Sequence, residues 1–188
     1  MISNTGMAVE KKHEVITLGA GCFWCTEAVF QRVKGIIKVE SGYSGGGIAN
    51  PTYREVTSGL TGHAEVLQVT FDPEKISLVK VLEIFWKTHD PTTLNRQGAD
   101  VGTQYRSAIF YHNEQQRVIA SQLKEQLNEQ KIWDAPIVTE ITAFKAFYKA
   151  EDYHQNYYNQ NQNQGYCQFV IVPKLKKFEK LFSDFIIK

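Results

Sequence analysis

The 188-residue sequence has few of the features that mark secreted, membrane-spanning or nucleic-acid-binding proteins. Its cysteines number only three, at uneven spacing, which makes a poor disulfide framework for a small secreted domain. Its longest apolar runs, such as 169–172, are far too short to span a bilayer. Lys and Arg total 21 against 20 Asp and Glu, so the chain lacks the basic field that nucleic acid or an anionic membrane requires. Residues 1–14 lack the apolar core of a secretory signal, and we expect a cytoplasmic protein.

What is present fits one folded unit. With 43% hydrophobic and 12% aromatic residues the chain can bury a substantial core, which excludes wholesale disorder. We expect residues 1–188 to form a single domain with a mobile N-terminus over 1–13. Residues 160–188 are expected to form a tail that begins with a Gln/Asn-rich linker. The near-neutral charge and the lack of a heptad pattern favour a monomer.

The periodicity of apolar residues predicts the order β-α-β-β-α-β over residues 15–111. This order is the split βαβ arrangement of ferredoxin-like folds, so we predict an α+β protein with helices packed on one face of a mixed sheet. Ser77 and Asn113 are expected to cap helices. The expected strands are 15–18, 36–41, 64–71, 107–111, 137–141 and 169–172, and the later helices are 113–131, 151–159 and one from residue 173 onward.

Cys22 stands where a strand, a Gly-Ala-Gly turn and the start of a helix meet. The free N–H groups and the positive end of the helix dipole favour a thiolate there, so we expect a lowered pKa and a reactive thiol. The alternative is a buried cysteine that fills a helix end. The flanking glycines let a ligand approach the backbone closely, which favours the reactive thiol.

Cys22 and Cys25 form a Cys-x-x-Cys pair with three readings. Half of a zinc site is one, although Cys167 is distant and a histidine would also be needed. A thioredoxin-like dithiol is another, but there the intervening residues are typically small or Pro. Here they are Phe23 and Trp24, which look more like a pocket for a small apolar group, with core packing as the alternative for one of the two.

Polar candidates lie on one predicted strand and in two loops. Alternation places Glu65 on the more apolar face of strand 64–71, where burial would raise its pKa and make it a general acid. The alternative is a glutamate at a frayed strand edge, facing water. Tyr53 and Tyr105 lie in polar loops and could simply cover the edge of the core. Asp100 could orient a partner or only form a turn.

Five segments in this order resemble A-type peptide methionine sulfoxide reductases over about residues 15–167. The ordered set is specific, whereas GYSGG alone is weak. The resemblance implies an α+β fold and reduction of the S epimer of methionine sulfoxide, free or in proteins, which repairs proteins after oxidative stress. The segments are GCFWCTE, GYSGG, NPTYREVTSGLTGHAE, HDPTTLNRQGADVGTQYRSAIFY and AEDYHQNYY.

The resemblance also assigns roles to individual residues. Cys22 would be the nucleophile, and Phe23 and Trp24 would surround the S-methyl group of the substrate. Glu65 would protonate the sulfoxide oxygen of the substrate, and Tyr53 and Tyr105 would donate hydrogen bonds to it. Asp100 would belong to the same polar network.

After reduction, Cys22 would be left as a sulfenic acid that condenses with another thiol. Family members often place this thiol after a Gly-Tyr step in the tail, which favours Cys167 as the resolving cysteine. Many relatives have Gly at the position of Cys25 and a further tail cysteine that is missing here, so Cys25 is an alternate. The family implies thioredoxin as the reductant that reopens the disulfide and no cofactor.

Two other functions stay open from the sequence. One is a thiol–disulfide oxidoreductase that works through Cys22 and Cys25 alone, which leaves Glu65 without a role. The other is a small zinc-binding interaction module, which the metal content of the purified protein would reveal.

Overall fold

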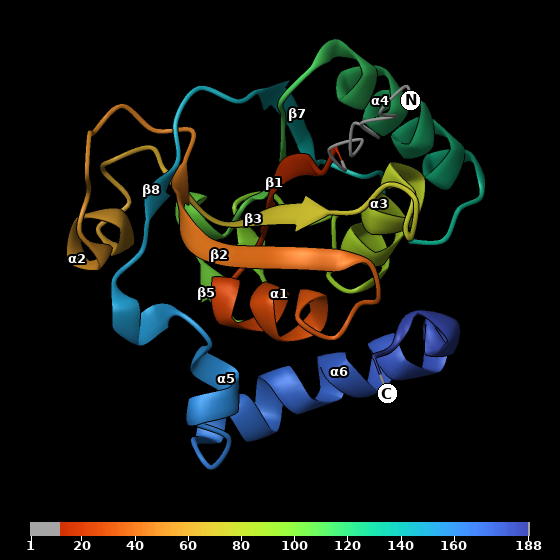
Figure 1. Ribbon diagram of the computed structural model, residues 1–188. Helices are drawn as coiled ribbons and strands as arrows, with labels where there is room; N and C mark the ends of the chain where they lie inside the picture. Colours follow the sequence, from red (N-terminus) through yellow and green to blue (C-terminus); the bar gives the residue numbers. More distant parts are fainter. Residues whose placement is uncertain (1–11, 188) are drawn as a thin grey trace, which may run out of the picture.

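The computed structural model describes residues 12–187, so the expected mobile N-terminus lies almost wholly outside the described residues. None of the helices within 12–187 is long and apolar enough to cross a membrane. The strands are β1 (Glu14–Ala20), β2 (Ile36–Ser44), β3 (Ala64–Phe71), β4 (Arg96–Gln97), β5 (Asp100–Val101), β6 (Ser107–Tyr111), β7 (Glu140–Ala143) and β8 (Tyr148–Lys149). The α-helices are α1 (Phe23–Phe30), α2 (Tyr53–Thr57), α3 (Leu78–Lys87), α4 (Glu114–Glu129), α5 (Tyr157–Gln160) and α6 (Val172–Leu181), shown in Figure 1. Short turns are the 3₁₀ helices η1 (Thr103–Tyr105), η2 (Asp152–His154) and η4 (Ser183–Phe185), and the π-helical turn η3 (Cys167–Ile171).

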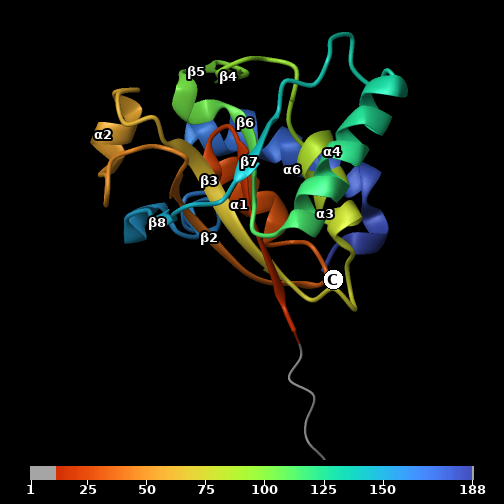
Figure 2. The same cartoon turned by 90° about the horizontal axis from the view of Figure 1, so that it is seen from above.

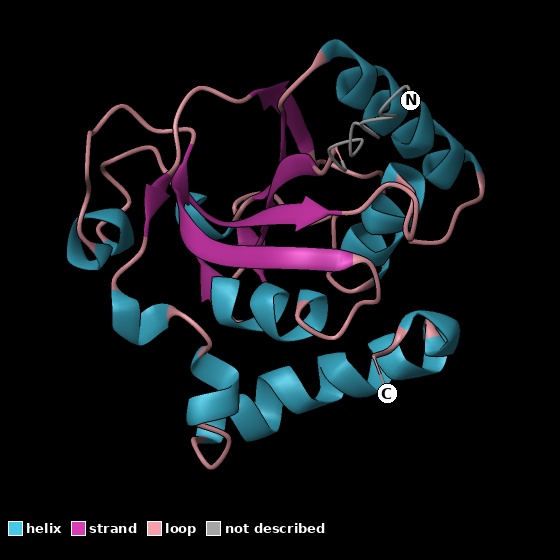
Figure 3. Cartoon of the chain, in the orientation of Figure 1, coloured by secondary structure: helices cyan, strands magenta, loops and turns pink. Residues whose placement is uncertain are grey.

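One six-stranded sheet forms the centre of the molecule, in the order β7-β6-β1-β3-β2-β8 (Figure 3). All neighbours are antiparallel except β6 and β7. Its four central strands, β6-β1-β3-β2, with α1 and α3 as their crossovers, have the split βαβ connectivity. The predicted α+β fold is therefore confirmed. A separate hairpin of β4 and β5 is inserted between α3 and β6.

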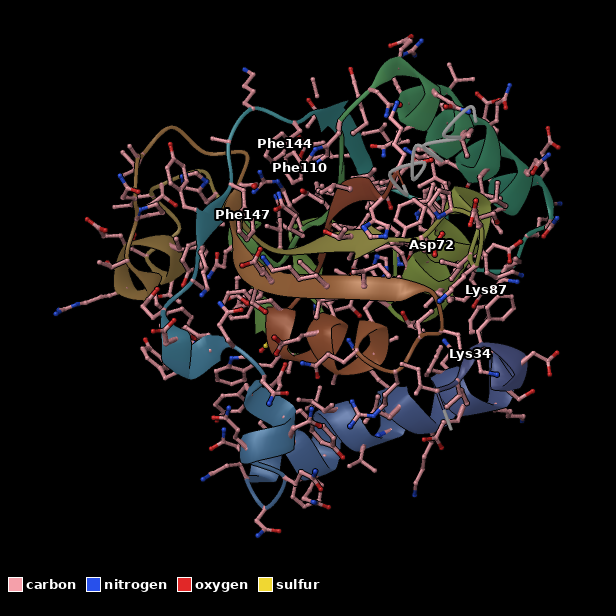
Figure 4. The ribbon with its side chains drawn as sticks, in the orientation of Figure 1. Lys34, Asp72, Lys87, Phe110, Phe144 and Phe147 are labelled. Carbon is pink, nitrogen blue, oxygen red and sulfur yellow. The ribbon has the colours of Figure 1, made fainter. Side chains whose placement is uncertain are left out.

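The two faces of the sheet are covered differently. Alternation along β3 sends Leu67 and Val69 into the main core, which also holds buried side chains from α1, α3, α4 and α6. Figure 2 shows these helices beside the strands from above. The other face carries a smaller cluster centred on Phe110, over which Phe144 and Phe147 pack (Figure 4). The long helices lie on the face of the sheet that presents the larger apolar area, because burying that area stabilises the fold more.

Helix starts follow the predicted capping residues. The Ser77 hydroxyl accepts a hydrogen bond from the backbone N–H of Lys80 at 3.2 Å, and Asn113 accepts one from Gln116 at 2.9 Å. Such caps satisfy donors that have no partner within the helix. The helix predicted over 113–131 is α4, which ends at Glu129.

The C-terminal third departs from the predicted elements. The strand predicted over 169–172 is wrong, since this stretch is the turn η3 and the first residue of α6. Ile171 is fully buried while Phe169 is 84% exposed, so the apolar run packs on one side only and has no strand to pair with. The helix predicted over 151–159 is divided into η2 and α5. The strand predicted over 137–141 corresponds to β7, which spans Glu140–Ala143.

Candidate active site

Cys22 lies at the N-cap of α1, directly after β1. The turn between them requires Gly21, which adopts a φ of +89°. A Cβ atom at Gly21 would lie 2.6 Å from the side chain of Gln97, so the β4–β5 hairpin packs tightly against this turn. The glycine-rich turn therefore places Cys22 at the start of α1, next to the β4–β5 hairpin.

Cys22 and Cys25 form a buried pair of thiols one helical turn apart. The backbone N–H of Cys25 donates to the carbonyl of Cys22 at 3.1 Å. Burial raises the pKa of Cys22 well above its ordinary value, because only 8% of the residue is exposed. The expected lowered pKa of Cys22 is therefore wrong for this resting state. Interaction with the Cys22 side chain and the charge of Lys174 instead lower the pKa of Cys25 to about 7.

Glu65 lies 1% exposed beneath the start of α1. Its Oε2 accepts the backbone N–H of Phe23 at 3.0 Å, which places the carboxyl next to Cys22. Burial raises the pKa of Glu65 to about 8, and this single hydrogen bond opposes the rise only in part. The alternative of a glutamate at a frayed edge facing water is excluded. The site thus contains a neutral carboxylic acid at pH 7.

Tyr53 and Tyr105 reach the same site from two loops. Tyr53 is the first residue of α2 and Tyr105 the last of η1, and both are half-buried. Burial and the nearby charge of Glu65 raise the pKa of Tyr53 to about 12 and raise that of Tyr105 as well. The charges of Asp100 and Cys22 also act on both phenols. The structure thus brings together the four polar residues predicted from the sequence.

The two aromatic residues after Cys22 occupy different environments. Phe23 is buried in a small cluster with Tyr43. Trp24 is half-buried and stacks on Tyr157, with ring centroids 3.7 Å apart and nearly parallel planes. Its indole N–H donates to Nδ1 of the buried His154 at 3.0 Å. The stacked ring and the hydrogen bond together fix the orientation of the Trp24 indole.

Sequence reasoning missed His154, Tyr157 and Tyr166. The first two lie in the segment AEDYHQNYY, whose order supported the family resemblance without assigning them a role. The Tyr166 hydroxyl donates to Asp100 Oδ2 at 2.8 Å and lies 3.6 Å from the sulfur of Cys25. Its position directly before Cys167 was the available signal.

Cys167 is completely buried in the turn η3 and does not lie on an extended tail. The preceding Gln/Asn-rich residues form a compact turn in which Gln164 donates from its backbone to Asn161 at 3.0 Å. Beside it, a groove of about 230 Å³ runs between the β4–β5 hairpin and α6, and its lining includes Asp100, Tyr166 and Phe169.

The donor set offers little to a metal ion. Within residues 12–187 no group of three or more His, Cys, Asp or Glu side chains is placed to hold one. A buried neutral acid, two phenols and a thiol pair instead suit a reaction that transfers a proton to an oxygen while sulfur attacks. Fold and site together define a thiol-dependent oxidoreductase.

Comparisons with known proteins identify the family. The sequence model of peptide methionine sulfoxide reductases matches residues 14–185. A relative from Saccharolobus solfataricus named peptide methionine sulfoxide reductase MsrA is 58% identical over 171 residues, 91% of this chain and 96% of the relative. The chain belongs to the A-type peptide methionine sulfoxide reductase family, and its chemistry is the reduction of methionine sulfoxide.

Solved structures agree. Reduced Mxr1 from Saccharomyces cerevisiae superposes with a TM-score of 0.77 and 37% identity, covering 88% of this chain and 95% of that chain. Mxr1 in complex with Trx2 superposes with a TM-score of 0.55 and 30% identity, covering 83% and 92%.

Proposed function

We propose that the protein reduces the S epimer of methionine sulfoxide, free or in proteins, with Cys22 as nucleophile and Glu65 as general acid. The observation that carries this assignment is the placement of the Glu65 carboxyl, buried and neutral, at the start of α1 beside Cys22. Repair of oxidised proteins follows from this activity.

Glu65 has the protonation state that the reaction needs. The sulfur of a sulfoxide is a poor electrophile, and a proton or hydrogen bond given to its oxygen makes the sulfur more positive. Glu65 supplies this proton, and Tyr53 and Tyr105 donate hydrogen bonds to the same oxygen, since burial keeps both phenols protonated. Asp100 belongs to the same polar group and accepts a hydrogen bond from the Tyr166 hydroxyl.

Cys22 attacks the activated sulfur as its own proton leaves. In the resting site Cys25 is the more acidic thiol of the pair. The sulfoxide oxygen ends on Cys22 as a sulfenic acid and methionine is released, so one thiol and one sulfoxide give one sulfenic acid and one thioether. Cys22 is oxidised by two electrons and the substrate is reduced by two.

We assign selectivity for one epimer to the indole ring of Trp24. Trp24, held by Tyr157 and His154, would contact the S-methyl group while the polar residues hold the oxygen. With methyl, oxygen and attacking sulfur each assigned to one side, only one configuration at sulfur fits.

Recycling would use thioredoxin. The solved complex of Mxr1 with Trx2 supports this partner, because Mxr1 shares the fold of this chain. Thiol–disulfide exchange with thioredoxin needs a disulfide on the reductase, which Cys22 forms with Cys25 or Cys167. The electrons then come from a protein dithiol and no bound cofactor is required.

A single-turnover assay tests this function. Pre-reduced protein without other reductant, given one equivalent of either epimer of N-acetylmethionine sulfoxide, should release about one methionine derivative per chain from the S epimer only. Cys22→Ser should release none. Equal release from both epimers would contradict the assigned site. Exchange with an unrelated protein disulfide without any sulfoxide reduction would favour the Cys22/Cys25 oxidoreductase instead.

A further inference from the structure

Cys25 is the one group in the thiol pair that the reductive step does not consume. It is buried, one helical turn after the nucleophile, and its backbone N–H donates to the carbonyl of Cys22 at 3.1 Å. Each of the two thiols shifts the pKa of the other, so the sulfur of Cys25 lies close to Cys22 when Cys22 is oxidised.

The backbone geometry suits a disulfide between the two residues. Residues three apart in an α-helix have Cα atoms about 5 Å apart. This spacing falls within the roughly 4.4–6.8 Å that disulfides span, so the bond can form without unfolding α1. The 3.1 Å hydrogen bond from the N–H of Cys25 to the carbonyl of Cys22, the N-cap residue, closes this turn and holds the two residues together at the start of α1.

The surroundings of Cys25 favour its thiolate. Lys174 on α6 lines the same small internal cavity as Cys25, and its charge stabilises an anion on that sulfur. Tyr166 places a hydroxyl 3.6 Å away. A thiol that ionises near pH 7 is the best attacking group in sulfur exchange, because it is both ionised and still nucleophilic.

Cys167 is less ready to react first. It is fully buried within η3, and burial raises the pKa of its thiol. The thiol whose charge acts on Cys167 is Cys25. Any movement of Cys167 toward Cys22 would displace a packed turn that buries Ile171 in the same core, which costs free energy.

We propose that Cys25 is the first resolving cysteine: its thiol condenses with the sulfenic acid of Cys22, forming a Cys22–Cys25 disulfide and releasing water. Cys167 enters afterwards, when its thiolate attacks the sulfur of Cys25. This exchange frees Cys22 as a thiol, which takes the proton lost by Cys167, and moves the oxidation to a Cys25–Cys167 disulfide. The order rests on the proposed function, since it presumes that Cys22 is the oxidised residue.

Rapid quenching of the wild-type protein tests the order directly. Pre-reduced enzyme is mixed with one equivalent of the S epimer, stopped by acid at increasing times, alkylated, digested and mapped by mass spectrometry. At the earliest times the Cys22–Cys25 disulfide should exceed any disulfide to Cys167 by about tenfold, because no local unfolding precedes it. A Cys22–Cys167 disulfide that appears first would overturn the proposal.

Two variants and a second oxidant complete the test. Cys167→Ser should still form one Cys22–Cys25 disulfide per methionine released, whereas Cys25→Ser should accumulate the sulfenic acid, detected by a carbon nucleophile such as dimedone. Disulfide formation in Cys25→Ser at the wild-type ratio to methionine released would contradict the order. Hydrogen peroxide replaces the sulfoxide in a parallel series, since it oxidises Cys22 without needing Glu65. Failure of sulfoxide reduction therefore remains distinguishable from failure of the disulfide order.

Discussion

Two buried carboxyl groups lie at helix α1, one on the helix itself and one on the neighbouring strand β3, and they have different consequences. Glu65 is 1% exposed and accepts one backbone N–H, from Phe23 at the start of α1. Glu27 is 2% exposed and accepts two, from Asn156 at 2.8 Å and from Tyr157 at 3.3 Å, at the start of α5. Burial raises the pKa of both groups, but at Glu27 two hydrogen bonds oppose the rise.

The difference shows that burial alone does not make a general acid. Glu65 meets the charges of Asp100 and Cys25 as well as a low-dielectric environment, all of which favour its proton. Glu27 serves as the cap that ties the tail to α1, which sets the position of Tyr157 against Trp24. Glu65 is therefore suited to the proposed role of general acid, whereas Glu27 holds the tail in place.

The strongest way to break this contrast is Glu65→Gln. The reductive step should slow by about 10²–10⁴-fold, because the amide cannot protonate the sulfoxide oxygen. In the wild type the contribution of the acid should be lost as the pH rises past about 8, and the variant should lack this fall. Methionine release in single turnovers across pH 6–10 measures both effects, and an unchanged rate would remove Glu65 from the acid role.

Stability gives an independent reading of the same variant. Because the pKa of Glu65 rises on folding from 4.5 to about 8, the native state holds a proton that the unfolded state loses. The free energy of unfolding of the wild type should therefore fall relative to Glu65→Gln as the pH rises through this window. Urea denaturation at several pH values would reveal it, and parallel curves would contradict the raised pKa.

Glu27→Ala should act on stability. It removes the acceptor of two backbone N–H groups at the start of α5, which should cost about 2 kcal/mol of unfolding free energy. Glu27→Gln retains an acceptor oxygen and serves as the matched control with a smaller loss. Urea denaturation measures the effect, and a change in Glu27→Ala below about 0.5 kcal/mol would show that these hydrogen bonds do not hold the tail.

The smallest expected effect concerns His154, a positioning residue that connects the two regions. His154→Phe keeps an aromatic ring against Tyr53 but removes the acceptor of the Trp24 N–H. The KM for the sulfoxide should rise about fivefold with little change in kcat, because substrate and transition state lose the same contact. Tyr153→Phe, at an exposed neighbour whose ring packs at a tilt on the same imidazole, is the control. A loss confined to kcat would contradict the positioning role.

Local sequence patterns predicted the central strands and helices of the fold and the positions of Cys22 and Glu65, because these depend on residues close in sequence. The alternation along β3 placed Glu65 on the buried face, and the Gly-Ala-Gly turn placed Cys22 at a helix start. The same local reasoning was wrong about the pKa of Cys22, since it included the helix dipole but could not include burial among the tail residues. It was also wrong about the strand predicted over 169–172, because this apolar run is helical and packs one side on the core.

The order of α and β elements could be predicted from the sequence, because turn glycines, capping residues and apolar periodicity act over a few neighbouring positions. The ordered motifs carried the family resemblance and, with it, the proposed roles of Cys22 and Glu65. Packing in three dimensions sets the surroundings of the Cys22–Cys25 pair and holds Trp24. Tyr166, His154 and Lys174 arrive at those places from the tail, more than a hundred positions along the chain. Their effects on pKa and orientation come from packing and proximity in space, and no short-range pattern encodes them.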